Sequence, residues 1–161
     1  MERMVKVTGI AYDLNVAKIT VRNVRDQPGI VAALFEPLAQ EGISVDTIVQ
    51  NTSQAQLSDI SFTVSRSDLS VALKMMRSIV ASLGTVEVAT DDSLAKVSIV
   101  GAGMQNAPGY AARMFRALST ADVNIEMITT SEIRITCIVK EEQVKKSVMA
   151  LHEAFELERG E

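Results

Sequence analysis

The stretch Asp26-Gln-Pro-Gly-Ile-Val-Ala-Ala-Leu-Phe-Glu-Pro-Leu38 returns in altered form as Asn106-Ala-Pro-Gly-Tyr-Ala-Ala-Arg-Met-Phe-Arg-Ala-Leu118. Pro28 and Pro108 are 80 positions apart, and so are the glycines that follow them. The same offset continues forward to Ile48 and Ile128 and backward to Ile19 and Ile99. A constant offset over so long a stretch indicates that one module has been duplicated.

The first copy predicts a strand followed by a helix. Lys18–Arg22 alternates polar and apolar residues, which is typical of a half-buried strand. Proline is favoured at the first helical position, so we expect a helix to begin at Pro28 with Asp26 as its cap. Gly42 should end this helix, and Pro37 should bend or shorten it. The apolar face is expected to consist of Val31, Leu34, Phe35 and Leu38.

The rest of the first copy predicts two further strands, a helix and a fourth strand. Strands are expected over residues 43–51, 60–64 and 86–89, from alternation and from flanking turn residues. Ser67 and Asp68 should cap a helix that ends before Gly84. The order is βαββαβ, which indicates an α+β, ferredoxin-like module.

The second copy repeats the first five elements and lacks the sixth. We expect strands over residues 96–101, 123–130 and 133–139, and helices over 108–121 and 141–156. A surplus strand over residues 4–11 precedes the first copy. We therefore predict that this strand completes the second sheet and that the first module is inserted in the second. The expected domains are residues 14–92, and residues 1–13 plus 93–161.

The composition excludes several functions. The chain has 161 residues, 47% of them apolar, and a net charge of −4 without a basic cluster, which argues against a nucleic-acid partner. Cys137 is the only cysteine and His152 the only histidine, so we predict no disulfide, no metal site, no catalytic residues and no cofactor. No signal peptide or membrane span is apparent, and we expect a cytoplasmic protein. Gly101-Ala-Gly103 lacks the third glycine of a dinucleotide fingerprint.

The Pro-Gly loop is the candidate binding feature. The free N–H groups at the start of a helix attract a carboxylate, and Asp26 could face an ammonium group. Asp46 and Gln50 lie on one side of the next strand, and Asn124 and Glu126 take the matching place in the second copy. Opposite poles suit a free amino acid. On spacing alone, the loop can equally be a turn and helix start with no ligand.

These segments resemble the ACT domain, a small-molecule sensor, and the paired version resembles the regulatory region of aspartate kinase. The resemblance rests on 21–29, 43–51, 97–104, 123–135 and 145–157, with Ser131-Glu-Ile-Arg-Ile135 the most specific stretch. It covers Val5 to Leu157 and implies the inserted topology. Nothing in the chain matches the catalytic domain, so the resemblance implies a regulatory β subunit of an α2β2 enzyme, or an equivalent regulatory fragment.

The family also implies effector sites and partners. Threonine, sometimes with lysine, binds between the ACT domains of two chains and inhibits phosphorylation of aspartate by ATP. The resemblance implies a homodimer through the ACT domains, associated with a catalytic α subunit. The threonine-type site would use Gly29, Ile30, Val31, Ala32, Gln50, Asn124 and Ile125. The lysine-type site would use Asp26, Asp46, Tyr110, Ala111 and Ser131.

Two positions favour threonine over lysine. Ala107 and Ala111 stand where some lysine-sensitive members carry a histidine and a hydroxyl residue. Two other readings stay open: a stand-alone ACT-repeat adaptor that senses a different ligand or mediates subunit assembly, and a small enzyme of ferredoxin-like fold. The second of these lacks any placed catalytic group.

Overall fold

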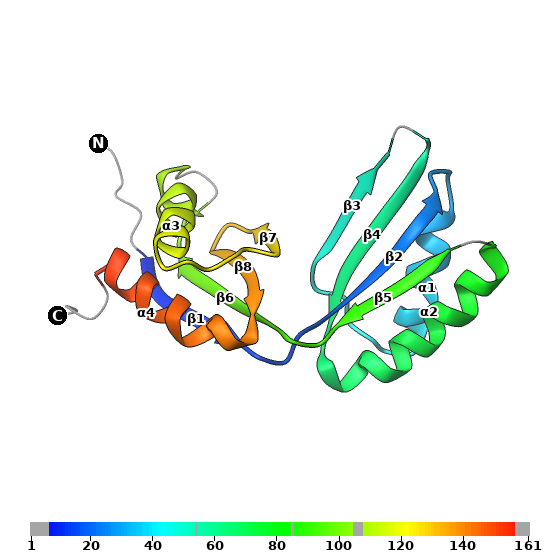
Figure 1. The fold of residues 1–161 in the computed structure, drawn as a ribbon, viewed down its shortest axis with the longest axis horizontal. Coiled ribbons are helices and arrows are strands. Elements are labelled where there is room, and N and C mark those ends of the chain that lie inside the picture. The colour runs from blue at the N-terminus through cyan, green and yellow to red at the C-terminus, as the bar shows by residue number, and fades with distance from the viewer. Residues whose placement is uncertain (1–6, 54, 85, 105–107, 157–161) are drawn as a thin grey trace. The chain divides into compact units, whose positions relative to one another are not determined.

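The computed structural model describes residues 7–53, 55–84, 86–104 and 108–156. The described chain divides into two compact units (Figure 1). We call Asn15–Asp92 the central unit, and the chain up to Leu14 together with the chain from Ser93 the split unit. That these units are independent domains, one inserted in the other, stays a prediction.

The central unit is a four-stranded antiparallel sheet with two helices. Its elements are β2 (Ala17–Arg25), α1 (Ile30–Gln40), β3 (Ile48–Thr52), β4 (Leu57–Val64), the 3-10 turn η1 (Arg66–Asp68), α2 (Leu69–Leu83) and β5 (Glu87–Asp91). The strand order is β3-β4-β2-β5. Both helices cover one face of this sheet (Figure 1), and Leu34, Phe62 and Met76 are fully buried between the two layers.

The split unit has the same architecture. It consists of β1 (Val7–Asp13), β6 (Leu94–Gly101), α3 (Pro108–Thr120), β7 (Met127–Thr130), β8 (Arg134–Lys140), the 3-10 turn η3 (Glu141–Gln143) and α4 (Val144–Ala154). The strand order is β1-β6-β8-β7, so β1 takes the place beside β6 that β5 takes beside β2. The α+β class and the βαββαβ pattern of each unit are confirmed.

The strand registers show that the 80-residue offset does not extend back to the first strand of each copy. Ile48 pairs with Phe62, which pairs with Ile19. In the split unit, Ile128 pairs with Cys137, which pairs with Val97. Ile19 therefore corresponds to Val97, not to Ile99. The second copy has two additional residues between its first strand and its helix, and the 80-residue offset holds only after them.

The start of α1 differs from the sequence prediction. The helix begins at Ile30, and Gly29 precedes it with φ 90°, in the left-handed region, without a side-chain cap. Asp26 is exposed and does not cap the helix, because the left-handed turn at Gly29 separates it from the first helical residue. In the second copy, by contrast, Pro108 is the first residue of α3, as predicted.

Leu34, Phe35 and Leu38 lie on the apolar face of α1 as predicted, but Val31 does not, and Ile30 takes its place. Ile30, Leu34 and Leu38 are buried at a spacing of four, whereas Val31 is 41% exposed. The helix also continues through Pro37 and ends three residues later, so its proline does not cut it short. Gly42 (φ 73°) follows the C-cap residue Glu41, and its N–H donates to Ala39 O while Ile43 N–H donates to Leu38 O. This pair of bonds is a Schellman motif, as the glycine predicted.

The second strand of each module is shorter than predicted. β3 begins at Ile48 rather than Ile43, and β7 begins at Met127 rather than Val123. Ile43 and Val123 are instead buried in the two cores at the helix ends. None of the helices in the described part of the chain has the length and apolarity needed to span a membrane.

Candidate functional site

The Pro-Gly loop of the central unit presents backbone groups at one end of the sheet. A side chain added at Gly29 would meet no atom within 4 Å, so the backbone there is open to approach. By helix geometry, the N–H groups of Val31 and Ala32 in the first turn have no intrahelical acceptor. The positive φ of Gly29 also favours glycine at this position. The loop can therefore offer N–H donors to a carboxylate.

Gln50 lies on the edge strand β3 at the same end of the sheet. β2 and β3 both run antiparallel to β4, so their carboxyl ends, and the loop after β2, lie together. The Nε2 of Gln50 donates to the buried Ser58 Oγ at 3.2 Å. This contact holds the exposed amide in place. Asp26 and Asp46 of the lysine-type set are exposed in the same unit.

The other predicted site residues belong to the split unit. Asn124 and Ile125 line a cavity of about 620 Å³ at the end of α3, together with Phe115, Ser119, Asp122, Val123 and Gln143. The Oε1 atom of Gln143 is buried there, without a hydrogen-bond partner among the described residues. The sequence did not predict a role for Gln143, because no motif or spacing pattern surrounds it.

The split-unit residues of the lysine-type set lie in two places. Tyr110 is half-buried in α3, with its ring stacked on Phe155 at 6.1 Å between centroids, and Ala111 follows it. Ser131 is exposed in the turn between β7 and β8, where its N–H donates to Arg134 O at 2.8 Å. Ala107 lies outside the described residues. A pocket that joins residues of both units stays a proposal.

The surroundings of Cys137 and His152 are typical of residues with a structural role. Cys137 is a fully buried free cysteine in β8, and burial raises the pKa of its thiol to about 12. The thiol therefore stays protonated near neutrality and is a poor nucleophile. His152 is half-buried on α4. Within the described residues, no group of three or more His, Cys, Asp or Glu side chains is placed to hold a metal ion.

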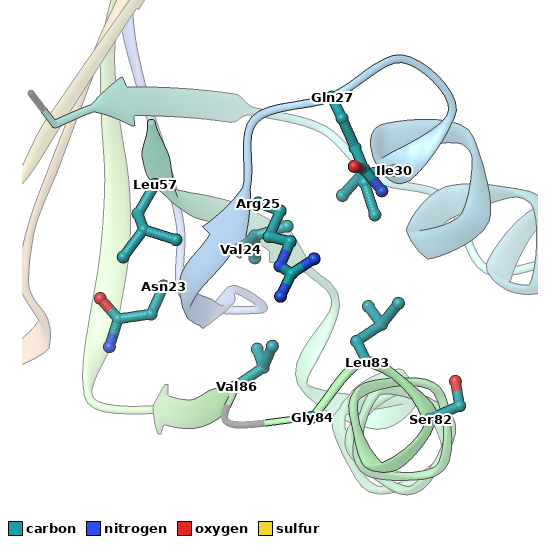
Figure 2. Close-up of a pocket in the computed structure, with 10 residues that line it drawn as sticks. All are labelled: Asn23, Val24, Arg25, Gln27, Ile30, Leu57, Ser82, Leu83, Gly84 and Val86. Atoms are coloured by element: carbon teal, nitrogen blue, oxygen red, sulfur yellow. The ribbon is translucent and has the colours of Figure 1, made fainter. Parts of the chain in front are cut away.

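A larger cavity, of about 810 Å³, lies beside the Pro-Gly loop within the central unit (Figure 2). Sequence reasoning missed it, although it adjoins the loop that the repeat had marked. Its walls come from the end of β2, the starts of α1 and β4, the end of α2 and the segment that leads into β5. The lining residues are Asn23, Val24, Arg25, Gln27, Ile30, Leu57, Ser82, Leu83, Gly84 and Val86.

The ACT domain family matches this chain twice, over residues 12–81 and 97–155. The regulatory subunit of aspartate kinase from Thermus thermophilus, solved without ligand, superposes with a TM-score of 0.88 at 40% identity over 92% of this chain and 98% of that chain. This chain belongs to the aspartate kinase regulatory family.

Two further relatives agree with this assignment. A structure of the aspartokinase alpha and beta subunits includes a chain with a TM-score of 0.86 and 40% identity, and the match covers 93% of this chain and 99% of that chain. An aspartate kinase of Stutzerimonas stutzeri is 42% identical over 94% of this chain. The match spans only 37% of that kinase. The predicted ACT pair is confirmed.

Proposed function

We propose that this chain binds threonine at the Pro-Gly loop of the central unit and thereby inhibits an associated aspartate kinase catalytic subunit. The observation that carries the proposal is the loop itself, where open space beside Gly29 adjoins the first-turn N–H groups of α1. These donors suit the carboxylate of an amino acid. Gln50, held by Ser58, is available for the hydroxyl of threonine.

The site is completed by a second chain in this proposal. Asn124 and Ile125 of one chain would close over the loop of its partner, so that effector binding and dimerisation reinforce each other. A ligand that binds only the closed dimer shifts the equilibrium towards it by its differential affinity. At a threonine concentration of a hundred times the Kd, the gain is about 2.7 kcal/mol.

Calorimetric titration with threonine, together with thermal unfolding, tests the proposal. Gln50→Ala should lower threonine affinity about tenfold, because a buried donor or acceptor of the ligand loses its partner. Gln40→Ala, at the exposed end of α1, is the matched control and should leave the affinity unchanged. The titration should reach a threonine concentration about a thousand times a micromolar Kd. If threonine then neither releases heat nor raises the unfolding temperature, the proposal fails.

Lysine is the second effector to be measured. In this proposal it occupies the lysine-type set, with its ammonium groups facing the exposed carboxylates of Asp26 and Asp46. Asp46→Asn should then weaken lysine binding and leave threonine binding intact. Loss of both would place the two effectors in one site.

Co-purification tests the catalytic partner. We expect this chain to retain an aspartate kinase catalytic chain from the same organism and to lower its activity when threonine is added. Retention without any effect of threonine would instead favour an adaptor that only assembles subunits.

A further inference from the structure

The large cavity of the central unit holds one charged side chain, and that side chain is a cation. Figure 2 shows the guanidinium of Arg25 extending into the space between Ile30, Leu83 and Val86. None of the described residues makes a hydrogen bond or ion pair with this guanidinium. The described residues that line the cavity include no carboxylate. The cavity is therefore electrostatically suited to an anion.

The remaining walls combine aliphatic side chains with neutral polar groups. Val24, Ile30, Leu57, Leu83 and Val86 supply aliphatic surface, and Asn23, Gln27 and Ser82 add neutral polar groups at the margin. A volume of about 810 Å³ lies within the range of small-molecule sites. A guanidinium pairs with a carboxylate through two parallel hydrogen bonds. Together these features fit a small carboxylic acid with an apolar side chain.

A β-bulge marks the strand that carries Arg25. The pairing of β2 with β4 shifts register between Val21 and Val24, and Asn23 within this shift has φ 59°. The N–H of Asn23 donates to Asp59 Oδ1 at 3.0 Å, which holds the bulge in place. Bulges change the direction in which side chains point, and they are frequent next to binding sites. Here the bulge comes immediately before Arg25.

In the described part of the split unit, aromatic side chains lie between the two helices. Tyr110, which corresponds to Ile30, stacks on Phe155 near the end of α4. The guanidinium of Arg113 lies over the Phe155 ring at 4.9 Å. Both rings pack against the core of that unit. No aromatic side chain is among the described residues that line the central-unit cavity.

We propose that the central-unit cavity is a binding site for a small carboxylate with an apolar side chain, which Arg25 anchors. The site shares Ile30 with the threonine-type set but is formed by one unit alone, so it needs no second chain. It does not rest on the proposed threonine function. A ligand there would contact the Pro-Gly loop from the α2 side.

Amide chemical shifts of the whole chain, titrated with 4-methylpentanoate, test this proposal. We expect the probe to shift the amides of Val24, Arg25, Leu83 and Val86, with saturation in the millimolar range. The neutral analogue 4-methylpentanamide should bind at least about tenfold more weakly, because it cannot form the charged hydrogen bonds. Arg25→Gln should lose affinity for the carboxylate by the same factor, and Arg25→Lys should retain part of it.

Arg22→Gln is the control, because Arg22 lies on the same strand, opposite Glu87 of β5, and outside the cavity. It should bind the carboxylate within about twofold of the parent chain. Equal binding of acid and amide, unchanged affinity of Arg25→Gln, or no shift at about 20 mM probe would overturn the proposal. Threonine is titrated into Arg25→Gln in parallel. Retained threonine binding would show two separate sites, and its loss would contradict their independence.

Discussion

Asp122 and Gly42 occupy the same position at the ends of two equivalent helices. Gly42 ends α1 with φ 73°, and Asp122 ends α3 with φ 59°. Asp122 N–H donates to Ser119 O and Val123 N–H donates to Leu118 O, which is the Schellman pattern of α1 again. The left-handed conformation costs an L-residue more than glycine. Two residues with the same backbone role therefore carry different strain.

We predict that Asp122→Gly raises the free energy of unfolding of the split unit by about 0.5–1 kcal/mol. Gly42→Asp should destabilise the central unit by a similar amount. Urea unfolding followed by tyrosine fluorescence measures the first change, since both tyrosines, Tyr12 and Tyr110, belong to the split unit. Destabilisation by Asp122→Gly would mean that the aspartate side chain itself stabilises the turn.

We predict that the buried thiol of Cys137 makes the folded chain less stable at high pH. Its thiol has a pKa of about 12 in the folded chain against 9.0 as the ordinary value, because burial disfavours the thiolate. The unfolded chain therefore binds fewer protons above pH 9, and the stability present below that pH falls as pH rises towards 12. The slope should approach about 1.4 kcal/mol per pH unit.

Urea unfolding at pH 8 and pH 10 measures this slope against a Cys137→Val variant. The variant lacks the thiol and should lose less stability between the two values. Equal losses would show that other groups carry the pH dependence. The folded parent should also resist thiol reagents at pH 8, because Cys137 is fully buried beside Met114.

At the scale of elements, β1 is the strand on which the split unit depends. It pairs with β6 from Val7 to Asp13 and places Val7 in the core of that unit. Its loss would leave β6 as an unpaired edge and expose apolar side chains to water. The insertion of one module in the other rests on this strand.

We predict that deletion of residues 1–12 destabilises the split unit and spares the central unit. Amide hydrogen exchange should become faster in β6, β8 and α4, with protection in β2 and β4 unchanged. If β6 kept its full protection, β1 would be dispensable, and the predicted discontinuous domain would be wrong.

The whole molecule contains one continuous unit and one interrupted unit. The central unit has its own core, which includes Leu34, Phe62 and Met76, and it needs no residue from outside Asn15–Asp92 to complete its sheet. We predict that a fragment of residues 14–92 folds alone and keeps the amide shifts that it has in the full chain.

The same fragment should bind threonine far more weakly than the whole chain, because it lacks Asn124 and Ile125. Calorimetric titration of both proteins measures the difference. The carboxylate probe, by contrast, should bind the fragment and the whole chain alike, since every residue that lines its cavity lies in the central unit. Undiminished threonine binding by the fragment would remove the split unit from the effector site.

Sequence patterns alone were enough to predict the duplication, the βαββαβ order and most of the buried positions. Repeats and alternating hydrophobicity are local patterns, and they describe local structure directly. Where local rules compete, they failed: Pro28 is a good helix start, yet the left-handed turn at Gly29 placed the start at Ile30.

Three-dimensional packing was needed to define the register of the paired strands, the correspondence of the two copies before the Pro-Gly loop, and the position of unfilled space. Ile19 corresponds to Val97 because pairing across three strands fixes register, and no local pattern contains that information. The cavity around Arg25 has the same origin. It depends on the packing of two helix ends against a bulged strand.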